Sequence, residues 1–145
     1  MWSFNYAAEL QPEDGGHLTV RFADLPEAIT SGEDRQDALQ QAADCLEEAI
    51  AGRIADGMDI PQASRPKRGR VLIPLSGSMA AKASLYLALR DAGISRTQLA
   101  RRLGVDEKEV RRMLNPRHPT KLPRIEQALA SLGRRLVVSL ETEAA

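Results

Sequence analysis

ISRTQLARRLGVDEKEVRRMLN, residues 94–115, repeats apolar side chains at helical spacing and fills the positions between them with charge. The spacing predicts two short helices, over 96–103 and 106–114, with Gly104 supplying the positive φ that the turn between them needs. Ala100 is small enough to let the two helices cross closely. Three aliphatic residues are spaced to anchor the second helix: Val105, Val110 and Met113. This pattern is typical of a helix-turn-helix.

The outward side chains of the second helix suit DNA. Such a helix lies in the major groove, where Arg recognises guanine and Asn recognises adenine through paired hydrogen bonds. The start of the first helix and the loop after the second are placed for phosphate contacts. The DNA-contacting residues that we predict are Arg96, Thr97, Gln98, Lys108, Arg111, Arg112, Asn115, Arg117 and Lys121. The same charges also fit a solvated surface on which the helix arginines pair with Glu107 and Glu109.

The net charge of zero hides a sharp division along the chain. Residues 1–63 carry three basic and thirteen acidic side chains, whereas residues 64–145 carry seventeen basic and seven acidic ones. A division this complete predicts two bodies with different partners: nucleic acid for the basic half and a basic molecule for the acidic half.

The first half has the pattern of a β-meander followed by one helix. Residues 2–10 and 17–25 have strand composition and flank the turn at 11–16, which predicts an antiparallel hairpin, and 27–32 predicts a short third strand. Residues 32–57 predict a helix. Its apolar stripe is Leu39, Ala42, Ala43, Leu46, Ala49, Ile50 and Ile54. One helix on the face of a meander is an α+β unit.

The boundary between the halves lies at or after the proline-rich basic stretch 59–69. Residues 70–75, RVLIPL, have strand composition and either follow the linker or form a fourth strand of the first unit, with the linker near 76–79. We place the domains at 1–75 and 76–145.

The second half is predicted to be mostly helical around the 94–115 stretch. Helices are expected over 79–93 and 124–133, and residues 134–141 alternate like a strand that could pair across subunits. The core face of the 79–93 helix is predicted to be Leu85, Leu87, Ala88 and Leu89.

Composition excludes several classes of protein. The single cysteine, Cys45, rules out an intrachain disulfide framework and suits a reducing cytoplasm. The scattered histidines give no metal-ligand spacing, and no apolar run is long enough for a membrane. A nuclease with divalent metal ions needs several converging carboxylates, yet the first strand offers only Glu9. We therefore expect no enzyme activity, no metal, no cofactor and no membrane.

In the order and spacing of its motifs the chain resembles the HicB antitoxin family of type II toxin–antitoxin modules. The segments that carry the resemblance are YAAELQPEDGG, HLTVRFADLP, ITSGED, IPQAS and LPRIEQALASLGRRLVVSL. Two positions depart from the family pattern. Ala23 stands where proline is common and Glu27 where glycine is common, so we expect a less tight turn there.

The resemblance implies a degenerate RNase H-like first domain that binds and blocks a small, basic, mRNA-cleaving HicA-type toxin. It also implies a second domain that forms a homodimer or higher oligomer and binds operator DNA. The fold class is thus α+β: an RNase H-like meander with a packed helix, then a small, mostly α-helical helix-turn-helix domain of the Xre/Cro type. Acidic residues in or near the meander loops are guesses for toxin contacts, and each also fits an ordinary solvated carboxylate: Asp14, Asp24, Glu27 and Glu33.

An alternative is a free-standing helix-turn-helix transcription regulator whose first domain senses a small molecule. A sensor needs a concave apolar pocket. The first half has only four aromatic residues, Trp2, Phe4, Tyr6 and Phe22, and we expect them to form the hydrophobic face under the helix.

Overall fold

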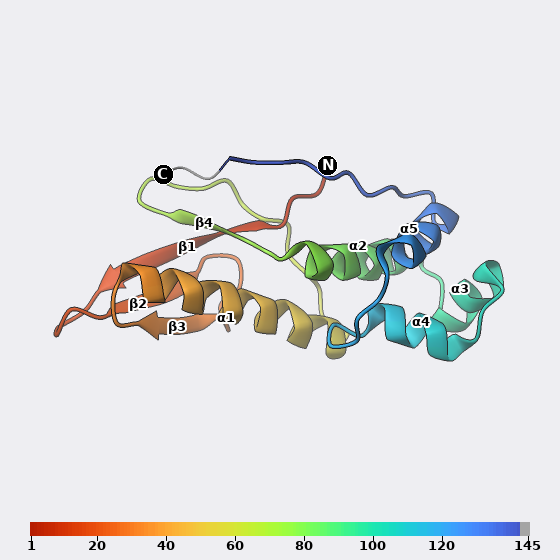
Figure 1. Cartoon of the computed structure of the whole chain (residues 1–145), viewed down its shortest axis with the longest axis horizontal. Coiled ribbons are helices and arrows are strands. Elements are labelled where there is room, and N and C mark those ends of the chain that lie inside the picture. Colours follow the sequence, from red (N-terminus) through yellow and green to blue (C-terminus); the bar gives the residue numbers. More distant parts are fainter. Residues whose placement is uncertain (143–145) are drawn as a thin grey trace.

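The computed structural model describes residues 1–142, which form an elongated molecule with a sheet at one end and a group of helices at the other (Figure 1). The sheet is antiparallel, with the order β3-β2-β1-β4. Its strands are β1 (Asn5–Pro12), β2 (Leu18–Phe22), β3 (Ile29–Gly32) and β4 (Val71–Pro74). The α+β class is confirmed.

The helix α1 (Arg35–Ala55) lies on one face of this sheet. It begins at Asp34, whose side chain accepts a hydrogen bond of 2.8 Å from the Asp37 N–H, satisfying one of the free N–H groups of the first turn. The residues that α1 buries are Ala38, Ala42, Leu46, Ile50, Ala51 and Ile54. The expected stripe is therefore partly wrong: Ala38 and Ala51 replace three half-buried residues, Leu39, Ala43 and Ala49.

Residues 70–75 supply the fourth strand. β4 pairs with β1 from Asn5↔Pro74 to Ala8↔Val71, so the sheet has one strand more than the expected meander. The basic stretch 59–69 is the connection from α1 to β4 and belongs to the sheet unit. The change of charge consequently falls inside that unit, and residues 1–75 together carry seven basic and thirteen acidic side chains, net −6.

The remaining elements are four helices: α2 (Gly77–Ala92), α3 (Arg96–Leu103), α4 (Glu107–Leu114) and α5 (Leu122–Ser131). α2 begins two residues before the predicted start because the Ser76 side chain caps it. α5 also begins two residues early, since Pro123 fits the first turn of a helix. In the described structure the predicted strand at 134–141 is an extended segment outside the sheet.

The two halves are packed together. Only Leu75 and Ser76 separate β4 from α2, and the buried side chains form one continuous core from the sheet to α5. From α2, Tyr86 donates a hydrogen bond of 2.7 Å to the Met58 carbonyl and Arg90 one of 2.7 Å to the Gly57 carbonyl. The cores are not separate, and the domain boundary after residue 75 stays a prediction. None of the helices in residues 1–142 is both long and apolar enough to cross a membrane.

The backbone of α1 lies very close to the sheet at Gly32, the last residue of β3. A Cβ at this position would lie 2.3 Å from the backbone nitrogen of Ala38. Gly32→Ala should therefore lower the free energy of unfolding by about 3 kcal/mol, because a helix backbone cannot move aside locally. Urea denaturation measures this.

Gly52, inside α1, is the matched control because a Cβ there would meet nothing within 4 Å. Gly52→Ala should raise the free energy of unfolding by about 0.5–1 kcal/mol through helix propensity. A Gly32→Ala protein as stable as the parent would contradict the close packing of β3 on α1.

Candidate nucleic-acid interface

Helices α3 and α4 are joined by a tight turn at Gly104, whose φ of 66° and ψ of 33° are left-handed. The Val105 N–H donates to the Ala100 carbonyl at 3.0 Å and closes the turn. Ala100 is buried, as its predicted place at the helix crossing requires. The buried side chains of α4 are Val110, Met113 and Leu114, whereas Val105 is only half-buried. The two predicted helices and the turn between them are present, with α4 beginning one residue later than predicted.

Three of the predicted DNA-contacting residues on α4, together with the residue at its C-cap, form one outward stripe. Lys108, Arg111, Arg112 and Asn115 lie at positions i, i+3, i+4 and i+7, and all four are exposed. Residues at this spacing share one face of an α-helix. The stripe lies opposite the buried side chains, so packing fixes which way it faces.

Glu109 decides how these charges are paired. Its carboxylate binds Arg112 at 3.0 Å and Arg124 of α5 at 2.7 Å, which fastens α4 to α5. Lys108 and Arg111 take part in none of the ion pairs found in residues 1–142. Arg112 is therefore paired on the protein surface, as the solvated-surface interpretation expects. Lys108 and Arg111 remain available to bind an anion.

The start of α3 has a capping box. The Ser95 hydroxyl accepts a hydrogen bond of 3.1 Å from the Gln98 N–H, and the Gln98 side chain accepts one of 2.8 Å from the Ser95 N–H. Gln98 thus has a structural role that we did not expect. The first N–H groups of a helix have no partner within it, so those of Arg96 and Thr97 stay available to a phosphate.

The loop between α4 and α5 holds the remaining predicted residues in different ways. The Asn115 side-chain oxygen accepts a hydrogen bond of 3.0 Å from the Arg117 N–H, which occupies one of the two groups needed to recognise adenine. Arg117 reaches back to Glu48 of α1 at 3.1 Å. Lys121 is exposed at the N-cap of α5. Of Asn115, Arg117 and Lys121, only Lys121 is exposed without a competing contact of its side chain in the described residues.

Lys82, which sequence reasoning missed, holds α4 from behind. It is buried in α2, and its Nζ donates to the carbonyls of Arg112 and Met113 at 3.0 and 3.1 Å and to the Thr120 hydroxyl at 2.8 Å. The last carbonyls of a helix have no partner within it and carry its negative dipole end, so a cation there is favourable. Burial lowers the pKa of Lys82 to about 8, which leaves it mostly charged at neutral pH.

The four acidic residues guessed as toxin contacts differ in availability. Asp24 accepts hydrogen bonds of 2.9 and 3.1 Å from Ser64, and Glu27 forms a two-pronged pair with Arg53 at 2.6 and 2.9 Å. This hydrogen bonding lowers the pKa of Glu27. Asp14 and Glu33 are exposed and form none of the ion pairs within residues 1–142.

Comparison with known proteins identifies the family. Residues 5–84 match the family model described as "HicB_like antitoxin of bacterial toxin-antitoxin system". The chain belongs to the HicB-like antitoxin family. The matched region covers the sheet, α1 and the first half of α2.

Curated HicB relatives extend the similarity into the second half. The chain is 33% identical over 139 residues to Antitoxin HicB 1 of Photorhabdus laumondii, covering 96% of this chain and 88% of that protein. It is 34% identical over 139 residues to Antitoxin HicB of Pseudomonas fluorescens, covering 95% and 94%. For Antitoxin HicB of Escherichia coli K12 the identity is 34% over 131 residues, covering 90% and 95%. These relatives are named as antitoxins and not as enzymes.

The buried lysine gives a test of how α4 is held. Lys82→Met keeps most of the side-chain volume but leaves three oxygen acceptors without their charged donor. We expect the free energy of unfolding to fall by about 1–3 kcal/mol, measured by urea denaturation at pH 7. Lys67→Met, at an exposed position, is the control and should stay within about 0.5 kcal/mol of the parent. Equal stability of both variants would contradict a supporting role for Lys82.

Proposed function

We propose that this protein is an antitoxin with two binding surfaces. Residues 1–75 bind and neutralise a small, mRNA-cleaving toxin of the HicA type, and the second half represses the operon by binding its operator DNA. The observation that carries the DNA part is the outward stripe of α4, which is exposed on a helix held by Lys82 of α2 and Arg124 of α5. Membership of the HicB-like family carries the toxin part.

The proposed division of labour on the DNA follows from the pairing of the charges. Arg111 projects from α4 with its guanidinium unpaired in the described structure, so it can donate two hydrogen bonds to one guanine. Lys121 and the free N–H groups of α3 hold phosphates and position the helix without reading sequence. Glu109 next to Arg112 lowers the attraction for phosphate in general, which suits a selective reader.

We further propose that the DNA-bound form is a two-fold dimer. A single eight-residue helix reads few base pairs, and dimers place two such helices about 34 Å apart, one turn of DNA. The operator would then be an inverted repeat.

On the toxin side, the acidic charge of the sheet unit supports capture of a basic partner. With a net charge of −6, residues 1–75 attract a basic molecule over a distance and raise its association rate. Because Asp24 and Glu27 already serve contacts within the chain, we assign the toxin contact first to Asp14 and Glu33.

One observation favours the alternative function, a sensor of small molecules. Trp2 and Phe4 do not lie under α1 as expected; they line an open groove against α2, and Trp2 is 41% exposed, whereas Tyr6 and Phe22 are buried. Purification from the native host separates the two functions. An antitoxin brings down a small basic protein encoded beside it, and a free-standing sensor does not.

The roles assigned to the DNA-contacting residues predict two different losses of DNA affinity. Arg111→Ala should weaken operator binding by about 1–3 kcal/mol and relax specificity at one base position. Lys121→Ala should weaken operator and random DNA alike and lower the slope of log K against log salt by about one. Fluorescence anisotropy over a salt series measures both.

Arg35→Ala, on α1 and far from α4 in the chain, is the control and should leave DNA binding unchanged. If both test variants lost the same affinity for operator and random DNA, the assigned roles would be wrong.

The toxin assignment predicts a separation of functions in the full chain. Asp14→Lys combined with Glu33→Lys should abolish rescue of cells that express the toxin, while operator binding stays within twofold of the parent (roughly 0.4 kcal/mol). Arg111→Ala combined with Arg112→Ala should abolish operator binding and leave the rescue of toxin-expressing cells intact. Glu126→Lys reverses an exposed acidic charge on α5 and should change neither. Full rescue by the Asp14–Glu33 variant would sink the assignment of these residues.

A further inference from the structure

The connection from α1 to β4 carries a positive charge for which the proposed function gives no role. Residues 64–75 supply four of the seven basic side chains of residues 1–75 and none of the acidic ones. We call residues 65–70 the basic turn, and its cations are Arg65, Lys67, Arg68 and Arg70. A basic toxin would be repelled by this segment, so the segment fits a partner of negative charge.

The basic turn is held at both of its ends. Before it, Asp24 accepts hydrogen bonds of 2.9 and 3.1 Å from the N–H and the hydroxyl of Ser64. Directly after it, β4 pairs with β1. Within it, the Arg70 N–H donates to the Lys67 carbonyl at 3.1 Å, and Gly69 supplies the positive φ of 84° that this turn needs. The cations therefore project from an ordered backbone, which reduces the entropy lost on binding.

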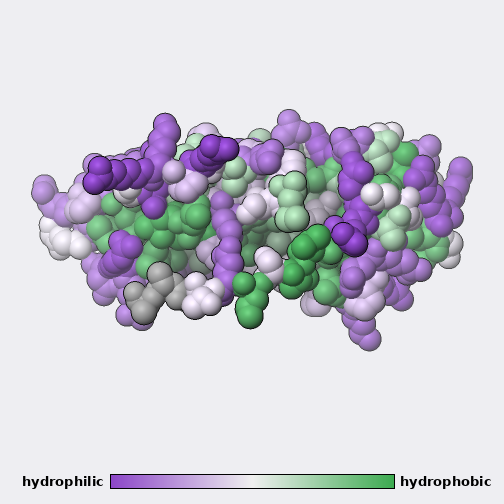
Figure 2. Space-filling model, turned by 90° about the horizontal axis from the view of Figure 1, so that it is seen from above, coloured by the Kyte–Doolittle hydropathy of each residue, from purple (hydrophilic) through white to green (hydrophobic). Residues whose placement is uncertain are grey.

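Three cations of the basic turn are free to bind an anion. Arg65, Lys67 and Arg68 are exposed and take part in none of the ion pairs found in residues 1–142. Figure 2, which looks onto the side along which the connection from α1 to β4 runs, shows hydrophilic side chains standing out at the sheet end of the molecule.

The fourth cation, Arg70, shares its acidic partner with Arg21. The Arg70 guanidinium lies 3.6 Å from the Glu9 carboxylate. Glu9 also stands directly opposite Arg21 in the β1–β2 ladder, where side chains of paired residues are neighbours. One carboxylate thus faces two guanidinium groups, and Arg21 adds to the positive charge beside the basic turn.

The basic turn lies at the same end of the molecule as the acidic residues that we assign to the toxin. In Figure 1 the connection before β4, the turn between β1 and β2 and the start of α1 all lie at the sheet end, whereas α4 lies at the opposite end. Asp14 belongs to that β1–β2 turn, and Glu33 lies just before α1. A toxin held by these two residues would sit beside the basic turn, far from operator DNA on α4.

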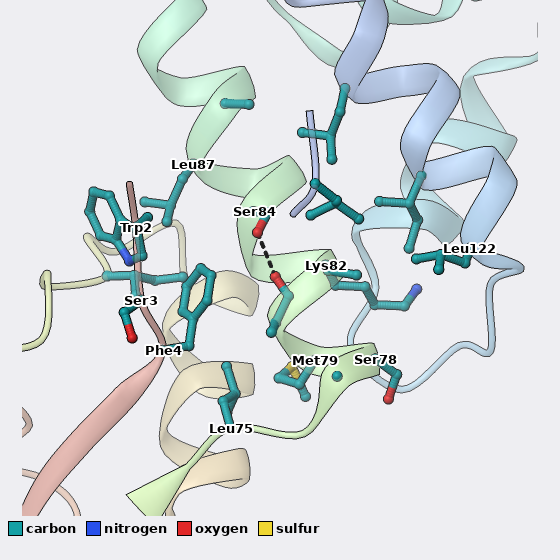
Figure 3. A pocket seen from close by; sticks show the side chains of 18 of the residues that line it. Trp2, Ser3, Phe4, Leu75, Ser78, Met79, Lys82, Ser84, Leu87 and Leu122 are labelled. Carbon is teal, nitrogen blue, oxygen red and sulfur yellow. Dashed lines mark hydrogen bonds between the residues drawn. The ribbon is translucent and has the colours of Figure 1, made fainter. Parts of the chain in front are cut away.

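The groove along α2 is less suited to a polyanion. Trp2, Phe4 and Leu87 line one side of it (Figure 3). Lys82 points away from these three side chains in the same view, and its Nζ is engaged by two carbonyls at the end of α4. The amine of Lys82 is therefore not available to a phosphate.

We propose that the basic turn, together with Arg21, binds the phosphodiester backbone of RNA. The choice of RNA rests on the proposed function, because a toxin that cleaves mRNA brings RNA to the sheet end. Contacts of Arg and Lys with phosphates hold a nucleic acid without reading its sequence. Residues 65–70 include no aromatic side chain on which a base could stack, so the contact is independent of sequence. An antitoxin with this contact captures a toxin that still carries its RNA.

Removing the charges of the basic turn tests the contact in the full chain. Arg65→Gln, Lys67→Gln and Arg68→Gln together should raise the Kd for labelled oligouridylate at least about tenfold at about 0.1 M salt. The slope of log K against log salt should fall by about two, since each phosphate contact with a single strand contributes about 0.7. Fluorescence anisotropy measures both. Operator affinity should stay within about twofold of the parent, because α4 is distant and unchanged.

A charge-matched variant is the control. Lys108→Gln, Arg111→Gln and Lys121→Gln together remove three exposed cations from the helical end. This protein should lose operator affinity and keep its RNA affinity within about threefold of the parent. If both triple variants lost the same RNA affinity, attraction to net charge alone would explain RNA binding and the proposal would be wrong. RNA binding unchanged in the variant of the basic turn would overturn it as well.

Two further ligands distinguish RNA from other anions. Duplex DNA of random sequence is held mainly by α4, so the variant of the basic turn should lose much less affinity for it than for oligouridylate. An equal loss for both would overturn the assignment to RNA. Vesicles of phosphatidylglycerol should bind the parent and this variant alike. Vesicle binding that depends on the basic turn, in a protein without affinity for RNA, would assign the segment to a lipid surface instead.

The outcomes separate this inference from the proposed function. RNA binding that depends on the basic turn, in a protein that fails to rescue cells expressing the toxin, would support the contact and contradict the proposed neutralisation. Rescue of such cells by a parent that has no affinity for RNA would overturn the contact and leave the proposed neutralisation intact.

Discussion

The segment 57–61, just after α1, holds the two halves of the molecule together through its backbone carbonyls. Those of Gly57 and Met58 accept hydrogen bonds from α2, that of Asp59 accepts one from Arg53 of α1, and that of Pro61 accepts one from Tyr6 of β1. Each lies between 2.7 and 2.8 Å. The bonds to Met58 and Pro61 are partly buried, where a carbonyl without a partner would be costly, and the four donors come from three different elements. The sheet, α1 and α2 are thereby tied at a single place.

The position of helix α4 depends on the position of α2. Lys82 of the tied α2 holds the carbonyls at its C-terminal end, and Glu109 on its flank binds Arg124 of α5. An eight-residue helix has little stability of its own, so these contacts and the buried aliphatic side chains determine where it stands. A helix held in this way loses little backbone conformational entropy when its outward side chains bind a partner.

The sequence predicts well what nearby residues decide. The bounds of α3, its Ser95 cap and the left-handed Gly104 follow from interactions within a few residues, and the structure agrees. Prediction from the sequence fails where two contacting residues are distant along the chain. Lys82 binds residues 30–38 positions away, and nothing in its alanine-rich neighbourhood reveals an acceptor. Trp2 and Phe4 have the composition of a core strand, but β1 begins only at Asn5. The residues of the candidate site could therefore be proposed from the sequence, whereas the distant residues that hold α4 in place could not.

The short connection between β4 and α2 has a mechanical consequence. Leu75 and Ser76 are its whole length, and both are fastened, Leu75 to the Phe4 carbonyl at 2.9 Å and Ser76 to Glu47 at 2.7 Å. A long linker would let the sheet change its orientation relative to the helices. This two-residue connection, fastened at both residues, holds the orientation fixed. Any molecule bound to the sheet projects at a set angle from the helical end. If the helical end binds DNA as proposed, steric exclusion between neighbouring complexes, rather than the reach of a linker, determines how many of them fit side by side on the DNA.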